Sequence, residues 1–172
     1  GTMPISMSGN PNSEEKETNT TLIEALMGKD LCYDIAPHAL SIAGDAKGIL
    51  VGGNLSMLYS LCGSDSDIDT QGKILFIEDL DEYLYHIDRM MMNLKRTGKL
   101  NQLAALVVGG MSDMNDNAIP FGKTAEEIIL EHTQNFNYPI YFGFQAGHQK
   151  LNVAMRFGMN AEITDNQLLL RA

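Results

Sequence analysis

Four short runs of consecutive apolar residues recur along the chain: residues 48–51 (GILV), 74–77 (ILFI), 103–108 (LAALVV) and 139–144 (PIYFGF). Each run is too short for a helix of ordinary length, and β-branched or aromatic residues are frequent among them. Apolarity that is continuous rather than alternating is typical of strands buried on both faces. We therefore predict that these runs are central strands of a sheet.

Helical patterns separate the runs. The first run is followed by apolar residues at helical spacing from Leu55 to Cys62, and the third by a helix that begins at about Thr124. The stripe after the second run leads to Gly98, a natural helix stop, and consists of Tyr83, Ile87, Met90, Met91 and Leu94. Strands that alternate with helices are joined by crossovers, so we predict an α/β fold with a largely parallel central sheet.

The amino-terminal segment differs in character from the rest of the chain. Residues 1–19 are polar and rich in Ser, Asn, Pro and Glu, which predicts an inter-domain linker or loop leading into one domain over residues 20–172. The sequence T-L-I-E, from Thr21 to Glu24, fits a capping box. It predicts a short helix that ends at Gly28.

Further short strands are predicted on both sides of the central repeat. Residues 31–46 have the pattern of short strands around Pro37. Residues 159–171 (MNAEITDNQLLLR) predict a strand, a turn at Asp165 and Asn166, and a second strand. A smaller set of antiparallel strands is therefore expected beside the parallel ones.

Composition excludes several classes of protein. The 172 residues include 22 acids and 12 bases, a net charge of −10, and no nucleic-acid partner is expected because a phosphate backbone requires a positive surface. No apolar stretch approaches the roughly 20 residues that span a bilayer, so no membrane partner is expected either. The first 20 residues show no secretory pattern, and two cysteines are too few for a disulfide framework. We therefore expect a cytoplasmic protein.

Candidate chemistry follows the ends of the predicted strands. The ligand crevice of an open α/β sheet lies beyond the carboxyl ends of its strands, where glycines let the backbone approach a ligand. At these positions the chain has Gly52-Gly53-Asn54, Glu78-Asp79, residues 109–113 (GGMSD) and residues 145–148 (QAGH). An acid and an imidazole at one edge, Glu78 and His148, are two parts of a nucleophilic triad. Asp79 and Glu82 are rivals, but Glu78 directly ends the buried run.

A convincing nucleophile is missing from this pattern. The chain has no G-x-S-x-G motif. Ser56 lies one turn into a predicted helix, and Ser112 follows a strand where capping is its expected role. His38, His86 and His132 lack the spacing to acids or cysteines that metal ligands need, so we expect surface or packing roles and no metal.

Residues 67–78 offer an alternative of a different class. The positions of an EF-hand calcium loop are nearly matched by Asp67, Asp69, Gln71, Gly72 and Glu78. The chain would then be a calcium-binding module, with Glu78 as a bidentate ligand. Against this alternative, the fifth position is Gln rather than Asp or Asn, an apolar run better suited to a strand precedes Glu78, and no second loop pairs with it.

Four segments occur in an order and spacing that point to a family: GILVGGNLSML (48–58), DTQGKILFIED (69–79) with YLYHIDRMM (83–91), LVVGG (106–110) and FGFQAGH (142–148). Together they resemble the LD-carboxypeptidases, also called muramoyl-tetrapeptide carboxypeptidases, which include the microcin-immunity peptidases. Each segment is weakly specific alone, whereas four in order are strongly so. The resemblance covers roughly residues 20–172.

The resemblance implies a serine-type peptidase in which Glu78 and His148 are two members of a Ser-Glu-His triad. The serine of the family lies in an amino-terminal domain that these 172 residues do not include. That domain is an expected partner, and this chain alone is expected to be inactive. The family's carboxy-terminal domain is a swivelling β/β/α unit. Asp81 stands where the family usually has glycine, a departure that could alter the turn after Glu78.

The implied reaction is hydrolysis of the L,D bond that releases terminal D-alanine from a muropeptide tetrapeptide, in cell-wall (peptidoglycan) recycling. No cofactor or metal is implied, and a homodimer is one assembly that we consider. Two alternatives stand beside the calcium-binding module of residues 67–78. One is a microcin-immunity-type peptidase of the same family. The other is a non-enzymatic swivelling module, whose histidine serves phosphotransfer or no chemistry.

Overall fold

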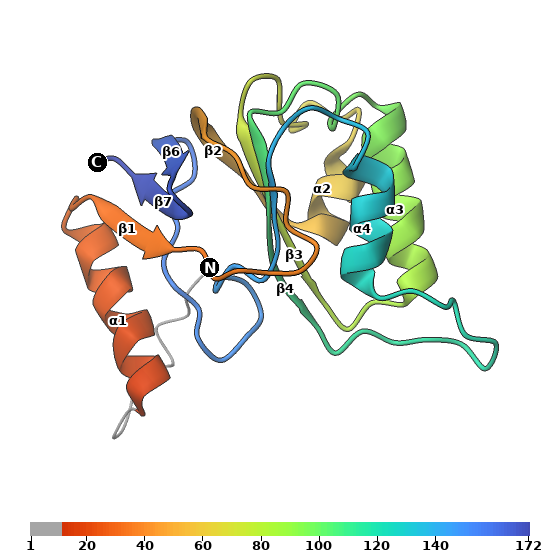
Figure 1. The fold of residues 1–172 in the computed structure, drawn as a ribbon, viewed down its shortest axis with the longest axis horizontal. Helices are drawn as coiled ribbons and strands as arrows, with labels where there is room; N and C mark the ends of the chain where they lie inside the picture. The colour runs from red at the N-terminus through yellow and green to blue at the C-terminus, as the bar shows by residue number, and fades with distance from the viewer. Residues whose placement is uncertain (1–11) are drawn as a thin grey trace.

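The computed structural model describes residues 12–172, and these form a seven-stranded sheet (Figure 1). The strands lie in the order β1-β7-β6-β2-β3-β4-β5. Strands β2 to β5 pair in parallel, whereas β6, β7 and β1 extend the sheet beyond β2 in antiparallel pairs. This arrangement confirms the predicted α/β class. The bounds are β1 (Leu31–Asp34), β2 (Ala46–Asn54), β3 (Ile74–Leu80), β4 (Ala105–Ser112), β5 (Ile140–Tyr141), β6 (Asn160–Thr164) and β7 (Gln167–Leu170).

Three helices cover one face of the parallel strands, and a fourth lies beside β1, far from the other three (Figure 1). The three are α2 (Leu55–Leu61), α3 (Leu84–Arg96) and α4 (Ala125–Thr133); the fourth is α1 (Ser13–Leu26). Helix α4 begins after Thr124, as predicted, with a capping box that Thr124 forms with Glu127. None of the helices within residues 12–172 is long and apolar enough to cross a membrane.

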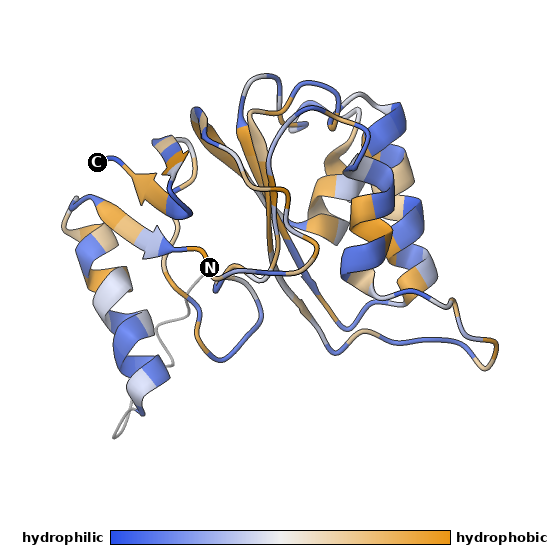
Figure 2. Cartoon of the chain, in the orientation of Figure 1, coloured by the Kyte–Doolittle hydropathy of each residue, from blue (hydrophilic) through white to orange (hydrophobic). Residues whose placement is uncertain are grey.

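The apolar runs on β3 and β4 are buried on both faces because alternate residues enter different cores, whereas Ile49 in the first run, on β2, is 40% exposed. On β3, Leu75 and Ile77 pack toward the helices, while Ile74 and Phe76 pack on the opposite side. Side chains alternate across a strand, so a strand covered on both faces needs an apolar residue at every position. Figure 2 shows hydrophobic residues along these strands, whereas α1 is mostly hydrophilic.

The start of α1 differs from the prediction. The helix begins at Ser13, eight residues before Thr21, with a capping box formed by Asn12 and Glu15. The hydroxyl of Thr21 donates to the carbonyl of Thr18, one turn back in the helix, and accepts from the backbone N–H of Ala154. The linker predicted over residues 1–19 is therefore helical from Ser13 onward, and its residues 1–11 lie outside the described part. The boundary at residue 20 stays a prediction.

The carboxy-terminal hairpin confirms a local prediction. Strands β6 and β7 are joined by Asp165 and Asn166, and both residues adopt positive φ values, 51° and 58°. Two successive left-handed residues suit a tight hairpin turn, and Asp and Asn tolerate that conformation better than most residues. The hairpin supplies the antiparallel strands expected beside the parallel sheet.

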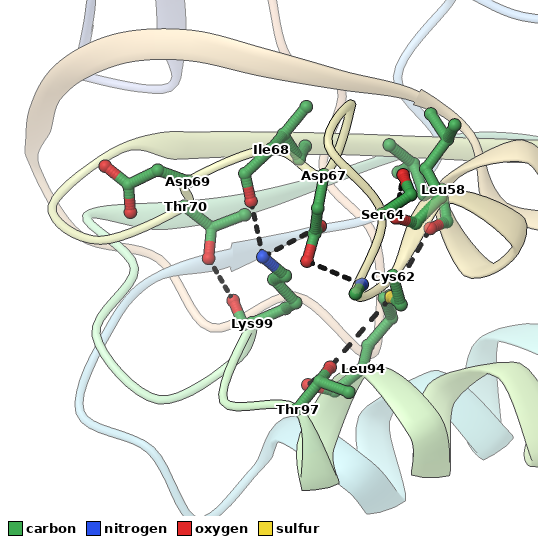
Figure 3. A network of polar contacts seen from close by, with 12 residues as sticks. Leu58, Cys62, Ser64, Asp67, Ile68, Asp69, Thr70, Leu94, Thr97 and Lys99 are labelled. Carbon is green, nitrogen blue, oxygen red and sulfur yellow. Dashed lines mark hydrogen bonds and ion pairs between the residues drawn. The ribbon is translucent and has the colours of Figure 1, made fainter.

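The calcium-loop alternative for residues 67–78 is wrong. Lys99 occupies the interior of the loop that precedes β3: its Nζ lies 2.8 Å from Asp67 Oδ1 and donates to the carbonyl of Ile68 at 2.6 Å (Figure 3). Glu78 lies in β3 and binds a different partner. The apolar run before Glu78 forms a central strand, which carries its carboxylate to the opposite end of β3 from Asp67.

Candidate active site

The site lies at the carboxyl edge of the parallel strands. Asn54 ends β2 and stands opposite Glu78 of β3 in the strand register. The chain after β5 passes over the same edge, because the N–H of Phe144 donates to the carbonyl of Val108 and the N–H of Gly110 donates to that of Ala146. These backbone bonds bring the segment that carries His148 across β4 to β3.

Glu78 and His148, the two residues singled out in the sequence, are brought together there. Nδ1 of His148 lies 2.7 Å from Oε2 of Glu78, and the backbone N–H of His148 donates to the same oxygen at 3.1 Å. A carboxylate only accepts hydrogen bonds, so Nδ1 is the donor, and in the neutral form of the ring Nε2 keeps its lone pair. The Glu78 side chain is 8% exposed and that of His148 is 52% exposed. A buried acid therefore orients an imidazole whose other nitrogen is accessible.

Gly147 makes this close approach possible. Its φ is +108°, and a Cβ atom at this position would lie 2.8 Å from both Cβ and Oε2 of Glu78. Two glycines at other strand ends have a similar role, since a Cβ on Gly52 would strike the carbonyl of Phe76 and one on Gly109 would strike that of Ala146. These two glycines thus let neighbouring segments of the chain pack together, whereas we had expected them to approach a ligand.

Asp79, a rival for the acid, does not face His148. Its Oδ1 accepts from Asn54 Nδ2 at 2.8 Å and from its neighbour's backbone N–H at 2.9 Å, and its Oδ2 accepts from the N–H of Ser56 at 3.0 Å. Burial raises the pKa of the Asp79 carboxyl above its usual value. Asn54 in turn caps α2 by accepting from the N–H of Met57. Asp79 therefore joins β3 to the start of α2.

The two serines weighed as nucleophiles make structural bonds. Ser56 Oγ donates to Asn54 Oδ1 at 2.7 Å, and Ser112 Oγ donates to the backbone carbonyl of His148. Neither hydroxyl bonds to the His148 ring within the described part of the chain. Ser112 instead helps to hold the segment that carries the imidazole.

The remaining histidines that form ion pairs are held by carboxylates other than Glu78. On α3, His86 Nδ1 is 2.9 Å from Glu82, and His132 Nε2 on α4 is 2.8 Å from Asp88 on α3. Both pairs have the surface or packing character expected of them. No group of three or more His, Cys, Asp and Glu within residues 12–172 is arranged to hold a metal ion.

The turn after β3 accommodates Asp81 in a conformation that favours glycine. Its φ is +58°, and its carboxylate accepts from Asn115 Nδ2 at 2.7 Å. Asp tolerates the left-handed region better than most residues because its short side chain can form local hydrogen bonds. Glu78 keeps its place despite this departure from the family pattern.

A cleft of about 570 Å³ opens beside the pair. Residues at the strand ends line it, together with α1 and the segment after His148: Leu22, Ala25, Leu26, Gly53, Asn54, Phe76, Glu78, Ala146, Gly147, His148, Asn152, Val153, Ala154, Met155, Arg156 and Phe157. The sequence-based reading missed the contributions of α1 and of residues 152–157. For residues 152–157, which have no strand or helix pattern, the signal available in the sequence was their closeness to His148.

The fold and the site together define the class: an α/β domain that presents an acid–imidazole pair at the carboxyl edge of its parallel strands. The chain belongs to the LD-carboxypeptidase family, because the model of the LD-carboxypeptidase C-terminal domain matches residues 47–163.

Individual relatives agree with this family. The probable murein peptide carboxypeptidase of Bacillus subtilis is 38% identical over 132 residues, which cover 74% of this chain and 40% of that protein. The microcin C7 self-immunity protein of Escherichia coli is 26% identical over 122 residues, or 70% of this chain and 35% of that protein. The crystal structure of muramoyltetrapeptide carboxypeptidase from Oxalobacter formigenes matches with a TM-score of 0.83 and 25% identity, over 96% of this chain and 57% of that one. The chain thus spans about 40% of the length of the first curated relative.

Proposed function

We propose that this chain supplies the glutamate and the histidine of a serine carboxypeptidase that releases terminal D-alanine from muropeptide tetrapeptides by hydrolysing an L,D bond. One observation carries the proposal. The buried carboxylate of Glu78 holds Nδ1 of His148 at 2.7 Å beside an open cleft, and the ring is half exposed. Relatives named as murein or muramoyltetrapeptide carboxypeptidases support the substrate class.

In the proposed reaction a serine from outside this chain attacks the carbonyl carbon of the scissile bond. His148 Nε2 takes the serine proton as the oxygen–carbon bond forms, and Glu78 stabilises the resulting imidazolium. His148 then gives the proton to the leaving nitrogen, so D-alanine departs as a neutral amine. Water repeats the same two proton transfers to free the shortened peptide from the serine.

The partner implied by this scheme is an amino-terminal domain that carries the serine. The first curated relative is two and a half times as long as the segment that this chain matches, which supports a larger protein. We place its role in peptidoglycan recycling in the cytoplasm, since the substrate would be a released muropeptide. The 172-residue chain alone should have no peptidase activity.

The decisive experiment measures D-alanine release from a muropeptide tetrapeptide by the full-length protein. We expect Glu78→Ala and His148→Ala each to reduce turnover by about a thousandfold or more. His86→Ala is the matched control, because it removes another imidazole held 2.9 Å from a carboxylate, and His86 is not among the residues that line the cleft. Rates like those of the wild type in either Glu78→Ala or His148→Ala would refute the proposal.

The microcin-immunity alternative is separated by a second substrate. The greater identity to the Bacillus subtilis relative, 38% against 26%, favours the murein peptide. An aminoacyl sulfamoyl adenosine offered to the same preparation tests the alternative directly. Faster cleavage of that compound than of the tetrapeptide would reverse the choice, and inactivity toward both would favour the non-enzymatic module.

A further inference from the structure

The cleft beside the Glu78–His148 pair contains a single fixed positive charge. Among its lining residues, all within the described chain, Arg156 is the only Lys or Arg and Glu78 is the only acid. The guanidinium group is always protonated and presents donors that match a carboxylate. In a chain with a net charge of −10, a lone arginine in the cleft is a distinctive feature.

One nitrogen of the Arg156 guanidinium group has a hydrogen-bond partner, and another has none among the described residues. Its Nη2 donates to the backbone carbonyl of Lys29, just beyond the end of α1, at 2.5 Å. Its Nε is buried and has no hydrogen-bond partner among the described residues. A buried donor without a partner is costly, so such groups are rare unless they serve a bound ligand or water.

The segment that carries Arg156 is fixed to the rest of the domain. The hydroxyls of Thr18 and Thr21 on α1 accept from the N–H groups of Asn152 and Ala154, and the hydroxyl of Tyr33 donates to the carbonyl of Ala154 at 2.6 Å. A donor on a fixed backbone loses less freedom when it binds a ligand than one on a mobile loop. The arrangement therefore presents Arg156 as a preorganised binding group.

We propose that Arg156 binds the free terminal carboxylate of the substrate, and this inference rests on the function proposed above. A carboxypeptidase must recognise the end of a peptide, and the end carries one extra negative charge. The carboxylate of Glu78 repels that charge within the same cleft, so binding needs a compensating cation. Arg156 is the one that the described cleft provides.

The experiment compares two peptides with one enzyme preparation. The full-length protein is given a tetrapeptide that ends in D-alanine and the same peptide that ends in D-alaninamide, and kcat/KM is measured for each. We expect the wild type to prefer the carboxylate, and Arg156→Gln to reduce that preference by about tenfold to a hundredfold, mainly through KM. Because the preference is a ratio of two rates from one preparation, loss of folded enzyme cancels.

Two further variants and one further peptide make the test specific. Arg156→Lys keeps the charge and should retain part of the preference. Arg171→Gln is the matched control, since Arg171 pairs with Asp30 outside the cleft, and it should leave the ratio unchanged. The third residue of a muropeptide tetrapeptide can be a diamino acid with a carboxylate on its side chain, and a peptide with L-lysine at that position lacks this side-chain carboxylate. If Arg156→Gln raises KM equally for the acid-ended and amide-ended peptides and no longer raises it for the lysine peptide, Arg156 binds the side-chain carboxylate instead, which overturns the assignment.

Failure of this inference is distinguishable from failure of the proposed function. If Glu78→Gln abolishes D-alanine release while Arg156→Gln leaves the carboxylate preference intact, only the role of Arg156 is refuted. If wild-type protein releases no D-alanine, or Glu78→Gln has no effect, the function is refuted and the inference falls with it.

Discussion

Two pairs of a carboxylate with a basic side chain lie at opposite ends of β3, and they differ in what remains free. At the carboxyl end, Glu78 holds His148 at 2.7 Å; at the amino end, Asp67 holds Lys99 at 2.8 Å (Figure 3). The His148 side chain is 52% exposed, whereas that of Lys99 is 16% exposed. The distances are nearly the same, so distance alone does not identify a reactive pair.

The two pairs differ in whether the basic side chain keeps an atom that is available for proton transfer. An imidazole that is held at Nδ1 still offers Nε2 for proton transfer. The ammonium of Lys99 also donates to the carbonyl of Ile68, and the hydroxyl of Thr70 donates to the carbonyl of Lys99, so the loop closes around it (Figure 3). Ligand sites in open α/β sheets lie at the carboxyl ends of strands. We therefore propose that the first pair is catalytic and that the second stabilises the fold.

The largest expected effect separates the two pairs by activity. Glu78→Gln should reduce D-alanine release by the full-length protein about a thousandfold to ten-thousandfold, because an amide does not stabilise an imidazolium and can favour the wrong tautomer. Asp67→Asn makes the same chemical change at the other pair and should leave kcat/KM within about threefold. A loss of similar size in both variants would show that the comparison is wrong.

The second effect contrasts two glycines with positive φ. Gly147→Ala would place a methyl group 2.8 Å from Glu78 Oε2, whereas Gly98→Ala, near Lys99, would meet nothing closer than Asn101 Nδ2 at 3.6 Å. Both changes strain the backbone, which costs on the order of 1 kcal/mol of unfolding free energy. Gly147→Ala should cost about 2 kcal/mol more through the overlap and reduce turnover at least tenfold.

Urea unfolding and D-alanine release measure the two consequences separately. Gly98→Ala should lower the stability without changing kcat/KM in the folded protein. If Gly147→Ala keeps the turnover of the wild type, close packing of Gly147 on Glu78 is not needed to orient His148.

The sequence predicts the strands well and the lining of the cleft poorly, for physical reasons. Burial on both faces of β3 demands an unbroken apolar run, which is visible in residues 74–77, and the position of Glu78 at the end of that run follows directly. The path of residues 152–157 depends instead on single hydrogen bonds to Thr18 and Thr21, which no periodicity reports.

The same cause explains the wrong start of α1. The sequence from Thr21 to Glu24 fits a capping box, but the side chain of Thr21 bonds within the helix and to Ala154. The threonine of an apparent capping box therefore forms a contact with a distant segment of the chain instead of capping a helix. Arg156 escaped notice for the same reason, because its place in the cleft depends on the carbonyl of Lys29, 127 residues earlier.

The smallest expected effect contrasts two aspartates by the sign of their pH dependence. The N–H of Gly63 and the ammonium of Lys99 hold the pKa of Asp67 below its usual value, while burial raises that of Asp79. A lowered pKa in the folded state adds stability above the unfolded value of about 4, and this stability is lost as the pH falls through the folded value. A raised pKa acts in the opposite sense. Its contribution to stability is present below about pH 4 and is lost as the pH rises through the pKa of the folded state.

Asp67→Asn should therefore reduce the free energy of unfolding at pH 7 by on the order of 1 kcal/mol and have less effect at pH 3, with exposure keeping the figure small. Asp79→Asn needs a different comparison, because it also replaces an oxygen that accepts the N–H of Ser56 and so costs about 1–3 kcal/mol at every pH. On top of that constant loss, the difference in unfolding free energy between the wild type and Asp79→Asn should shrink as the pH rises from 3 to 7. The corresponding difference for Asp67→Asn should grow over the same range. Urea unfolding of the 172-residue chain at several pH values measures how each difference in unfolding free energy changes with pH. If both differences change in the same direction, hydrogen bonding at Asp67 and burial at Asp79 do not have opposite effects at the two ends of β3.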